Sequence, residues 1–476
     1  MNFNSLQYLL FLPVTLILYF ALPRKIKNLT LLIASFYFYA CWQPAYALLM
    51  LFSIAATYLC GRLIGSFPDR KKLWLALCFG VNLAILFFFK YFNFASLTLC
   101  SALEFFGVEL SPPTLNVLLP VGISFYTFQA LGYTVDVYRG DVDPEKNFID
   151  YALFVSFFPQ LVAGPIERTG NILPQLKTAR KLKLVNLRDG MTLILWGLMK
   201  KMIIADNAAT IVNTVYNNVG EHSGKQFIFA TVAFAIQIYC DFSAYSDIAR
   251  GSARLLDIEL MKNFDCPYGA QSIKDFWRRW HISLSTWFKD YLYFPLGGSR
   301  KGKARTLINL VIVFLVSGLW HGAAMTFVAW GLLHGIYQVI GALTTPLRKK
   351  LFPKDNVILG IFRTLFTFAL VCLGWVLFRA NSLSDALVIF KEIFTLSGVF
   401  DIFSLGLSRG MLAAVGIFSA LLLAFDFTDR KGKVSAFINA HAAVRCLVWF
   451  ILLLSIFVFG YYGSGFDPQD FVYFQF

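Results

Sequence analysis

The segment VILGIFRTLFTFALVCLGWVLF, Val357–Phe378, is almost wholly apolar, with Arg363 as its one charged side chain. A helix needs about 20 mainly apolar residues to cross the hydrocarbon core of a bilayer. Similar runs occur at Ser5–Leu22, Tyr46–Gly65 and Leu73–Lys90, and the same length criterion predicts roughly ten to twelve spans. The segment therefore indicates an all-α integral membrane protein.

The overall composition indicates the same class of protein. Of the 476 residues, 58% are hydrophobic, 17% are aromatic and only 14% are charged. So few charged side chains cannot cover the surface of a soluble globule of this length. Because no internal repeat, low-complexity segment or long linker divides the chain, we expect one membrane domain over residues 1–476, with its core motifs at about 120–343.

The net charge of +15 comes from basic residues that cluster in short loops between the apolar runs, for example Lys274–Arg305 and Arg348–Lys354. Short basic loops of membrane proteins face the cytoplasm. We therefore expect these clusters to set the orientation in the bilayer rather than to bind nucleic acid. The first apolar run has no basic residue before it and no clear cleavage site, so we expect a span rather than a signal peptide.

The segment richest in polar and aromatic side chains is FWRRWHISLSTWFKDYLYFPLGG, Phe276–Gly298. Wound as one helix, it would carry its tryptophans and His281 on one face and its basic and hydroxyl side chains on the other. That pattern predicts a basic amphipathic helix at the cytoplasmic interface. From spacing alone, tryptophans that anchor the helix at the interface explain the segment better than catalysis by His281 does. The candidate residues are Trp277, Arg278, Arg279, Trp280, His281, Ser285 and Asp290.

A second candidate, His321, lies in SGLWHGA at the boundary between two apolar runs. Ionisable residues inside membrane spans are costly and commonly mark function. Gly318 and Gly322 would let another chain or a ligand approach the ring closely. A histidine that only pairs with a carbonyl group for packing explains the pattern equally well. We expect His334 to point away from His321 even on a continuous helix.

The segment QIYCDFSAYSDIAR, Gln237–Arg250, places acidic side chains inside an apolar run. Asp247 and Arg250 are spaced to pair on a helix, and a structural ion pair is a more common role than lining a polar tunnel. Polar residues also crowd Gly122–Arg139, and prolines and glycines interrupt Phe157–Arg168. Because such segments are tolerated at membrane depth only inside protein or beside a cavity, we expect the functional centre in the middle of the chain.

Two classes of site are not indicated. The eight cysteines are scattered without CxxC spacing, and no HExxH metal motif, phosphate loop or dinucleotide fingerprint occurs. We therefore expect neither a metal site nor a bound cofactor.

Taken together, five motifs resemble the alginate O-acetyltransferase branch of the membrane-bound O-acyltransferase (MBOAT) family, with the similarity running from the first spans to about Asn381. The motifs are PVGISFYTF (Pro120–Phe128), FFPQLVAGPIER (Phe157–Arg168), YCDFSAYSD (Tyr239–Asp247), WRRWHISLSTWFKDYLYFPLGGSR (Trp277–Arg300) and SGLWHG (Ser317–Gly322). The resemblance implies a ring of membrane helices, with re-entrant or interfacial helices, around a central tunnel.

The resemblance also implies roles for individual residues. His321 matches the catalytic histidine of the family, and His281 matches a second histidine that is expected to take part in catalysis. The remaining candidates are expected to bind the donor or line the tunnel. They are Trp277, Arg278, Arg279, Trp280, Ser285, Asp290, Tyr239, Asp241, Tyr245, Asp247 and Trp320.

The reaction that the resemblance implies is O-acetylation of an extracytoplasmic polysaccharide of the alginate, peptidoglycan or cellulose type. Acetyl-CoA would be the cytoplasmic donor substrate. A separate exported acetyltransferase, similar to SGNH hydrolases, would complete the modification. The protein would then be a multi-pass protein of the bacterial cytoplasmic (inner) membrane.

Other functions remain open at this point. A sister branch transfers D-alanine from a carrier protein toward teichoic acids and shares both histidine motifs, although the sequence GGSR at Gly297–Arg300 favours the acetyl-transferring branch. A transporter or channel would also use intramembrane histidines, aspartates and broken helices. A structural scaffold for polysaccharide assembly, with packed histidines, is a third alternative.

Overall fold

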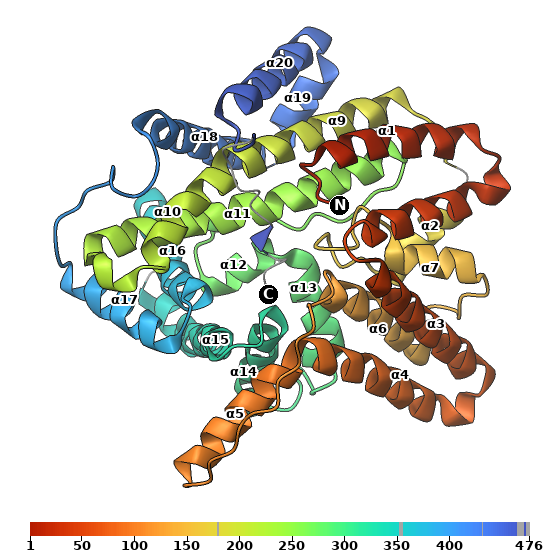
Figure 1. Ribbon diagram of the computed structural model, residues 1–476, viewed down its shortest axis with the longest axis horizontal. Coiled ribbons are helices and arrows are strands. Elements are labelled where there is room, and N and C mark those ends of the chain that lie inside the picture. Colours follow the sequence, from red (N-terminus) through yellow and green to blue (C-terminus); the bar gives the residue numbers. More distant parts are fainter. Residues whose placement is uncertain (179, 352–355, 431, 464–470, 473–476) are drawn as a thin grey trace. The chain divides into compact units, whose positions relative to one another are not determined.

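The computed structural model describes residues 1–178, 180–351, 356–430, 432–463 and 471–472 (Figure 1). Lys354 of the predicted basic cluster lies outside them. The described residues form helices and loops, and no strand occurs among them. The chain divides into two compact units, Met1–Met191 with Ala249–Met261 and Thr192–Ile248 with Lys262–Phe476. This division leaves the prediction of a single membrane domain untested.

Several helices have the length and composition of membrane spans, which confirms the predicted all-α membrane class. In the part of the chain that the structure describes, eight helical segments are long and apolar enough to cross a bilayer. Helix α1 (Leu6–Ala21) is apolar but shorter, and the prediction of ten to twelve spans included such short runs. The eight segments are Pro44–Ser66, Pro68–Phe105, Gly224–Leu255, Lys303–His321, Met325–Arg348, Val357–Arg379, Arg409–Thr428 and Ala442–Phe459.

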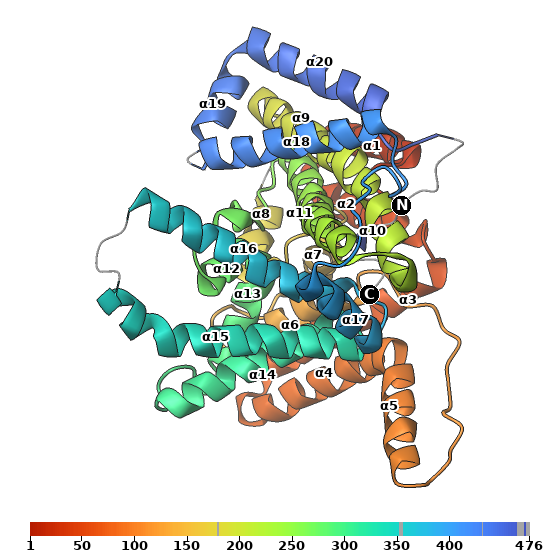
Figure 2. The same ribbon diagram turned by 90° about the vertical axis from the view of Figure 1, so that its left-hand side faces the viewer.

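The first unit is built around helix α6 (Ile123–Arg139), which is buried on all sides from Ile123 to Val137. Helices α3 and α4 pack against it (Figures 1 and 2). The predicted break in the helix at Pro159, Gly164 and Pro165 is confirmed, since residues 157–168 form turns and irregular backbone that are mostly buried. The elements of this unit are α1, α2 (Arg24–Ala40), α3 (Pro44–Ser66), η1 (Pro68–Arg70), α4 (Lys71–Leu86), η2 (Phe87–Tyr91), α5 (Phe92–Phe105), α6, α7 (Phe148–Ser156) and α8 (Thr169–Lys177).

The second unit contains all the histidines singled out above. Helices α9 (Leu184–Met199) and α11 (Gly224–Leu255) have residues in both units. Two segments of the second unit, η3 and η6, are π-helical. Its elements are η3 (Lys200–Ala205), α10 (Asp206–Tyr216), η4 (Val219–Glu221), η5 (Pro267–Gly269), α12 (Ile273–Arg279), α13 (Ile282–Phe288), η6 (Lys289–Tyr293), α14 (Lys303–His321), α15 (Met325–Leu351), α16 (Val357–Arg379), α17 (Leu383–Thr395), α18 (Arg409–Thr428), α19 (Lys433–Ala440) and α20 (Ala442–Phe459).

Helices α14 and α15 form a close hairpin that fixes the position of His321 (Figure 2). A Cβ added to Gly318 would lie 2.2 Å from the carbonyl oxygen of Phe327, and one added to Gly331 would lie 2.4 Å from that of Phe314. Small residues at such positions let two membrane helices approach at backbone distance. The hairpin therefore holds His321, the last residue of α14, against the start of α15.

The prediction of one amphipathic helix over Phe276–Gly298 is wrong. Helix α12 ends at Arg279, and α13 begins at Ile282. Between them His281 has a left-handed backbone, with φ of 44°. Such a conformation costs a non-glycine residue on the order of 1–3 kcal/mol and persists only where its surroundings compensate.

The compensation for this break comes from Asn263. Its backbone oxygen accepts a hydrogen bond from the Ile282 N–H at 3.0 Å. Its side-chain Oδ1 accepts hydrogen bonds from the backbone N–H of Ser283 at 3.1 Å and from the Ser283 hydroxyl at 3.0 Å. Asn263 therefore caps α13 from another segment of the chain, in place of the helical turn that a continuous helix would provide.

Candidate functional site

The two predicted catalytic histidines both contact one indole. The ring centre of Trp320 is 6.0 Å from that of His281 and 5.0 Å from that of His321. Both histidines are buried, with 0% and 4% of their surface exposed. The structure thus brings together two motifs that are far apart in sequence, and Trp320 is the residue that joins them.

His281 is held in one orientation as a neutral ring. Its Nδ1 lies 3.3 Å from Oδ1 of Asn263, which is an acceptor because the Ser283 N–H donates to it. This contact places the ring proton on Nδ1 and the lone pair on Nε2. The ring also meets Phe242 edge-on, at 4.6 Å between centres. Burial lowers the pKa of His281 well below its ordinary value, because no water can solvate the charged form.

His321 lies among aromatic rings from three helices. Its ring centre is 5.0 Å from that of Trp330 on α15 and 5.3 Å from that of Phe378 on α16. The turn after it is tight, because a Cβ on Gly322 would lie 2.1 Å from the Phe327 ring. The imidazole is therefore fixed in place by its neighbours, and one of them, Phe378, also lines the cavity described below.

His334 lies closer to this cluster than the sequence suggested. The expectation that it points away from His321 applies to a continuous helix, whereas α14 ends at His321 and His334 lies on the separate helix α15. The ring of Trp330 contacts both histidines, with centres 5.0 Å from His321 and 4.9 Å from His334. The indole Nε1 of Trp277 also donates a hydrogen bond to Nδ1 of His334, at 3.2 Å.

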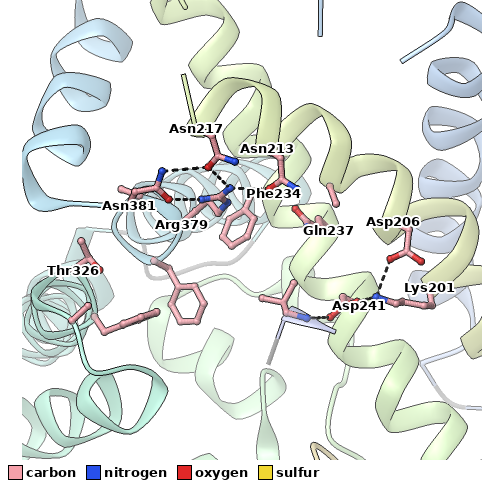
Figure 3. A pocket seen from close by; sticks show the side chains of 16 residues that line it. Lys201, Asp206, Asn213, Asn217, Phe234, Gln237, Asp241, Thr326, Arg379 and Asn381 are labelled. Carbon is pink, nitrogen blue, oxygen red and sulfur yellow. Dashed lines mark hydrogen bonds and ion pairs between the residues drawn. The ribbon is translucent and has the colours of Figure 1, made fainter. Parts of the chain in front are cut away.

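A cavity of about 410 Å³ lies within the second unit (Figure 3). Pockets that hold small ligands usually measure about 300–1,000 Å³. Phe327 and Phe378 form part of the wall, and the ring centre of Phe378 lies 5.3 Å from that of His321. Charged and amide side chains form most of the remainder, in two groups with Phe234 and Gln237 between them (Figure 3).

The deep group of charges consists of Lys201, Asp206 and Asp241. The Lys201 ammonium lies 2.8 Å from the Asp206 carboxylate and 2.7 Å from the Asp241 carboxylate, and all three side chains are at most 3% exposed. The backbone N–H of Val472 also donates to Asp241, at 2.7 Å. Asp241, predicted to line a tunnel, therefore does line the cavity, as part of a buried ion pair.

The second group surrounds Arg379 at the end of α16. Its guanidinium donates to the amide oxygens of Asn213 at 2.8 Å, Asn217 at 3.0 Å and Asn381 at 3.1 Å. Asn217 and Asn381 are exposed, so this side of the cavity lies nearer the protein surface than the buried Lys201 does. The cavity thus combines a polar outer side with a deep charged side.

Other predicted residues have structural partners in the second unit. Trp277 and Trp280 pack against other aromatic rings. The ring centre of Trp277 is 5.7 Å from that of Trp330, and the ring centre of Trp280 is 5.1 Å from that of Trp375. Asp247 pairs with Lys200 at 2.5 Å. Tyr239 donates a hydrogen bond to Asp426.

The remaining predicted donor residues lie outside the lining of this cavity. Arg278 and Arg279 both pair with Asp275, and the Arg278 side chain is 72% exposed. The Ser285 hydroxyl donates to the Trp280 carbonyl at 3.3 Å. Asp290 is half-buried on η6, and Tyr245 meets the ring of Phe471. The sequence motifs did not separate these residues from those that line the cavity.

Several residues of the site were missed by the sequence reasoning. Asn263, Lys201, Asp206 and Arg379 belong to none of the motifs that were singled out. One signal could have identified the lysines, because Lys200 and Lys201 stand together inside the apolar run LILWGLMKKMIIA. Paired charges at such a place need buried partners. Asn263 and Arg379 gave no comparable signal, since Asn263 stands among polar residues and Arg379 stands at the end of an apolar run, where basic residues are common.

The amino-acid sequence is similar to a protein family and to several named proteins. The model of a family described as MBOAT, membrane-bound O-acyltransferase family, matches residues 143–383. That range contains His281, His321, His334 and Arg379. The chain is 37% identical over 505 aligned positions to a Pseudomonas putida protein named probable alginate O-acetylase AlgI, with all of both chains covered.

Two further relatives have different names. A Helicobacter pylori protein named peptidoglycan O-acetyltransferase is 38% identical over 82% of this chain and 79% of its own length. A Bacillus subtilis protein named teichoic acid D-alanyltransferase is 27% identical over 56% of this chain and 71% of its own length. The chain is thus more similar to the proteins named for acetyl transfer than to the D-alanyltransferase, and the similarity covers more of its length.

Proposed function

From the premise that the chain belongs to the membrane-bound O-acyltransferase family, we propose that it moves an acetyl group from acetyl-CoA toward an extracytoplasmic polysaccharide. The chain is a membrane O-acyltransferase. The proposal rests above all on the position of His321, a buried imidazole whose ring lies 5.3 Å from Phe378, a residue in the wall of a cavity of ligand size.

In the proposed reaction, His321 is the general base. It accepts the proton of an acceptor hydroxyl while the hydroxyl oxygen attacks the thioester carbonyl carbon. The carbon–sulfur bond then breaks, and the imidazolium returns the proton to the departing sulfur, so that an O-ester and a free thiol result. A histidine is suited to both steps because its ordinary pKa lies near 6.5.

His281 would act through Nε2, the ring nitrogen that its contact with Asn263 leaves as the lone-pair nitrogen. Because burial lowers its pKa, the ring stays neutral at pH 7 and can accept a hydrogen bond from the acceptor or the donor. We propose that it orients the reacting groups, while His321, which contacts the same Trp320 indole, moves the proton.

The proposed orientation brings the donor from the cytoplasm. Helix α14 begins at Lys303, next to the basic residues Arg300 and Lys301, and its 19 residues extend to His321. At 1.5 Å per residue, His321 lies about 28 Å from that basic end, which is close to the full thickness of the hydrocarbon core. With the basic loops in the cytoplasm, the outer side of the cavity at Asn381 would face the opposite compartment.

The acceptor and partner are inferred from the relatives and the resemblance. Relatives named for alginate and peptidoglycan O-acetylation support a polysaccharide as the final acceptor. We propose that a separate exported acetyltransferase, similar to SGNH hydrolases, receives the group and completes the modification. We also propose that this reaction takes place in the bacterial inner membrane.

A donor comparison tests this function. Purified protein in nanodiscs is given either acetyl-CoA or a D-alanyl carrier protein, together with extracts that contain the exported partner. We expect thiol release and ester-bound label from acetyl-CoA only, because the chain is more similar to the acetyl-transferring relatives over most of its length. Label from the D-alanyl carrier alone would contradict the proposal and place the chain with the teichoic acid enzymes.

A further inference from the structure

We propose that His334 is a positioning residue, which holds Trp277 and Trp330 in place and thereby fixes His281 and His321 relative to each other. This inference deepens the proposed function and rests on it. His334 belongs to none of the five family motifs quoted above, and it is 0% exposed inside helix α15.

The first contact that carries the inference is the hydrogen bond from Trp277 to His334. The indole Nε1 of Trp277 can only donate, so Nδ1 of His334 is the acceptor, at 3.2 Å. In the neutral ring the proton then lies on Nε2. The bond joins α15 to α12, and α12 ends two residues after Trp277, directly before the Trp280–His281 turn. His334 therefore anchors the last turn of α12, directly before His281.

The second contact is the ring of Trp330. Its ring centre is 4.9 Å from that of His334 and 5.0 Å from that of His321. Because both imidazoles pack against this one indole, a shift of His334 would also shift His321. Trp277 also meets Trp330, at 5.7 Å between centres. His334, Trp277 and Trp330 thus form one closed group of rings, which contacts His321 through Trp330 and is joined to His281 through the end of α12.

A third helix confines the imidazole from the opposite direction. A Cβ added to Gly374 on α16 would lie 2.7 Å from Nε2 of His334, which is closer than real Cβ contacts are. Glycine at this position lets α16 approach the ring. Because three helices meet on one side chain, a displaced His334 would shift several of the surrounding rings at once.

The kinetic test uses His334→Leu, which is similar in size but cannot accept the Trp277 hydrogen bond. We expect kcat for acetyl transfer to fall about 10- to 100-fold, since a misplacement of about 1 Å at a reacting group costs on the order of 10²-fold. The KM for acetyl-CoA should change less than about threefold, because the proposal gives His334 no contact with the donor. His334→Asn, which retains an acceptor near Nδ1, should restore most of the rate.

Two further variants separate positioning from loss of structure. In the pair His334→Leu and Trp277→Phe, the double variant should be no slower than the worse single variant, because both remove the same hydrogen bond. Gly374→Ala should reproduce the loss in kcat by displacing the ring. His222→Leu is the matched control, since that half-buried histidine bonds the carbonyl of Thr214 outside the aromatic group, and its kcat should equal that of the wild type.

A spectroscopic readout keeps the inference separate from the proposed function. With ¹⁵N-labelled tryptophan, the indole N–H signal of Trp277 should move in His334→Leu and stay unchanged in His222→Leu. A folded His334→Leu variant with wild-type kcat, or an unmoved Trp277 signal, would overturn the inference. If the wild type transfers no acetyl group but the Trp277 signal still moves in His334→Leu, the proposed function is overturned and the hydrogen bond between Trp277 and His334 is established.

Discussion

Replacement of His321 by alanine is expected to lower kcat for acetyl transfer by about 10²- to 10⁴-fold, which is the usual contribution of a general base. The methyl group of alanine cannot accept the proton of the attacking hydroxyl. The measurement is the rate of thiol release from acetyl-CoA by monodisperse protein in nanodiscs. Binding of acetyl-CoA should change little, because the proposed role of His321 lies in the proton transfer.

The control for this variant is His441→Ala, which removes an exposed histidine whose Nδ1 contacts the Phe437 carbonyl. It should retain the wild-type rate. His321→Gln should be as slow as His321→Ala, since a glutamine side chain fills part of the space but is not a base. A His321→Ala protein that is folded and transfers acetyl groups at the wild-type rate would remove this residue from the mechanism.

Replacement of Lys201 by methionine is expected to destabilise the protein by about 3–5 kcal/mol, the usual cost of removing one partner from a buried ion pair. The variant would leave the carboxylates of Asp206 and Asp241 buried together without the ammonium that lies 2.8 Å and 2.7 Å from them in the wild type. The measurement is thermal or denaturant unfolding in detergent, together with the yield of monodisperse protein.

Two comparisons make the Lys201 result specific. Lys225→Met removes an exposed lysine of α11 and should change stability by less than about 0.5 kcal/mol. The triple variant Lys201→Met, Asp206→Asn, Asp241→Asn should regain much of the loss, because no uncompensated charge remains. A Lys201→Met protein as stable as Lys225→Met would contradict the view that the Lys201 ammonium stabilises the two buried carboxylates.

The membrane class and the family could be predicted because both depend on local sequence. An apolar run such as Val357–Phe378 predicts a membrane span by itself, since length and hydropathy decide whether a helix can span a bilayer. The two histidine motifs are long enough to identify the family without any knowledge of their contacts. These predictions needed no information about which segments meet in space.

The break at His281 could not be predicted for the opposite reason. The residues from Trp277 to Tyr291 repeat at helical spacing, and nothing among them stops a helix. The break is compensated by Asn263, which lies outside the segment and supplies two oxygen atoms to the start of α13. Periodicity measures the local preference of a segment, whereas this cap is a contact between separate segments.

The composition of the cavity was predicted only in part. Asp241 was recognised because an aspartate stands out in an apolar run, but its partner Lys201 comes from a different helical segment. Arg278 and Arg279 were grouped with the tryptophans by sequence, although both pair with Asp275 on the same helix. Arg379 appeared to be an ordinary basic residue at the end of a span. Its role at the cavity depends on Asn213 and Asn217 from another segment and on Asn381 two residues further along the chain.

The most direct test of the central claim is a sidedness measurement in proteoliposomes that contain protein in one orientation. Labelled acetyl-CoA is supplied only on the side of the basic loops, and the exported partner with its polysaccharide only on the other. The account predicts that ester-bound label appears on the far side with the wild type and not with His321→Ala, while coenzyme A stays where it was added. Label that appears only on the side of the donor, or equally with both proteins, would contradict it.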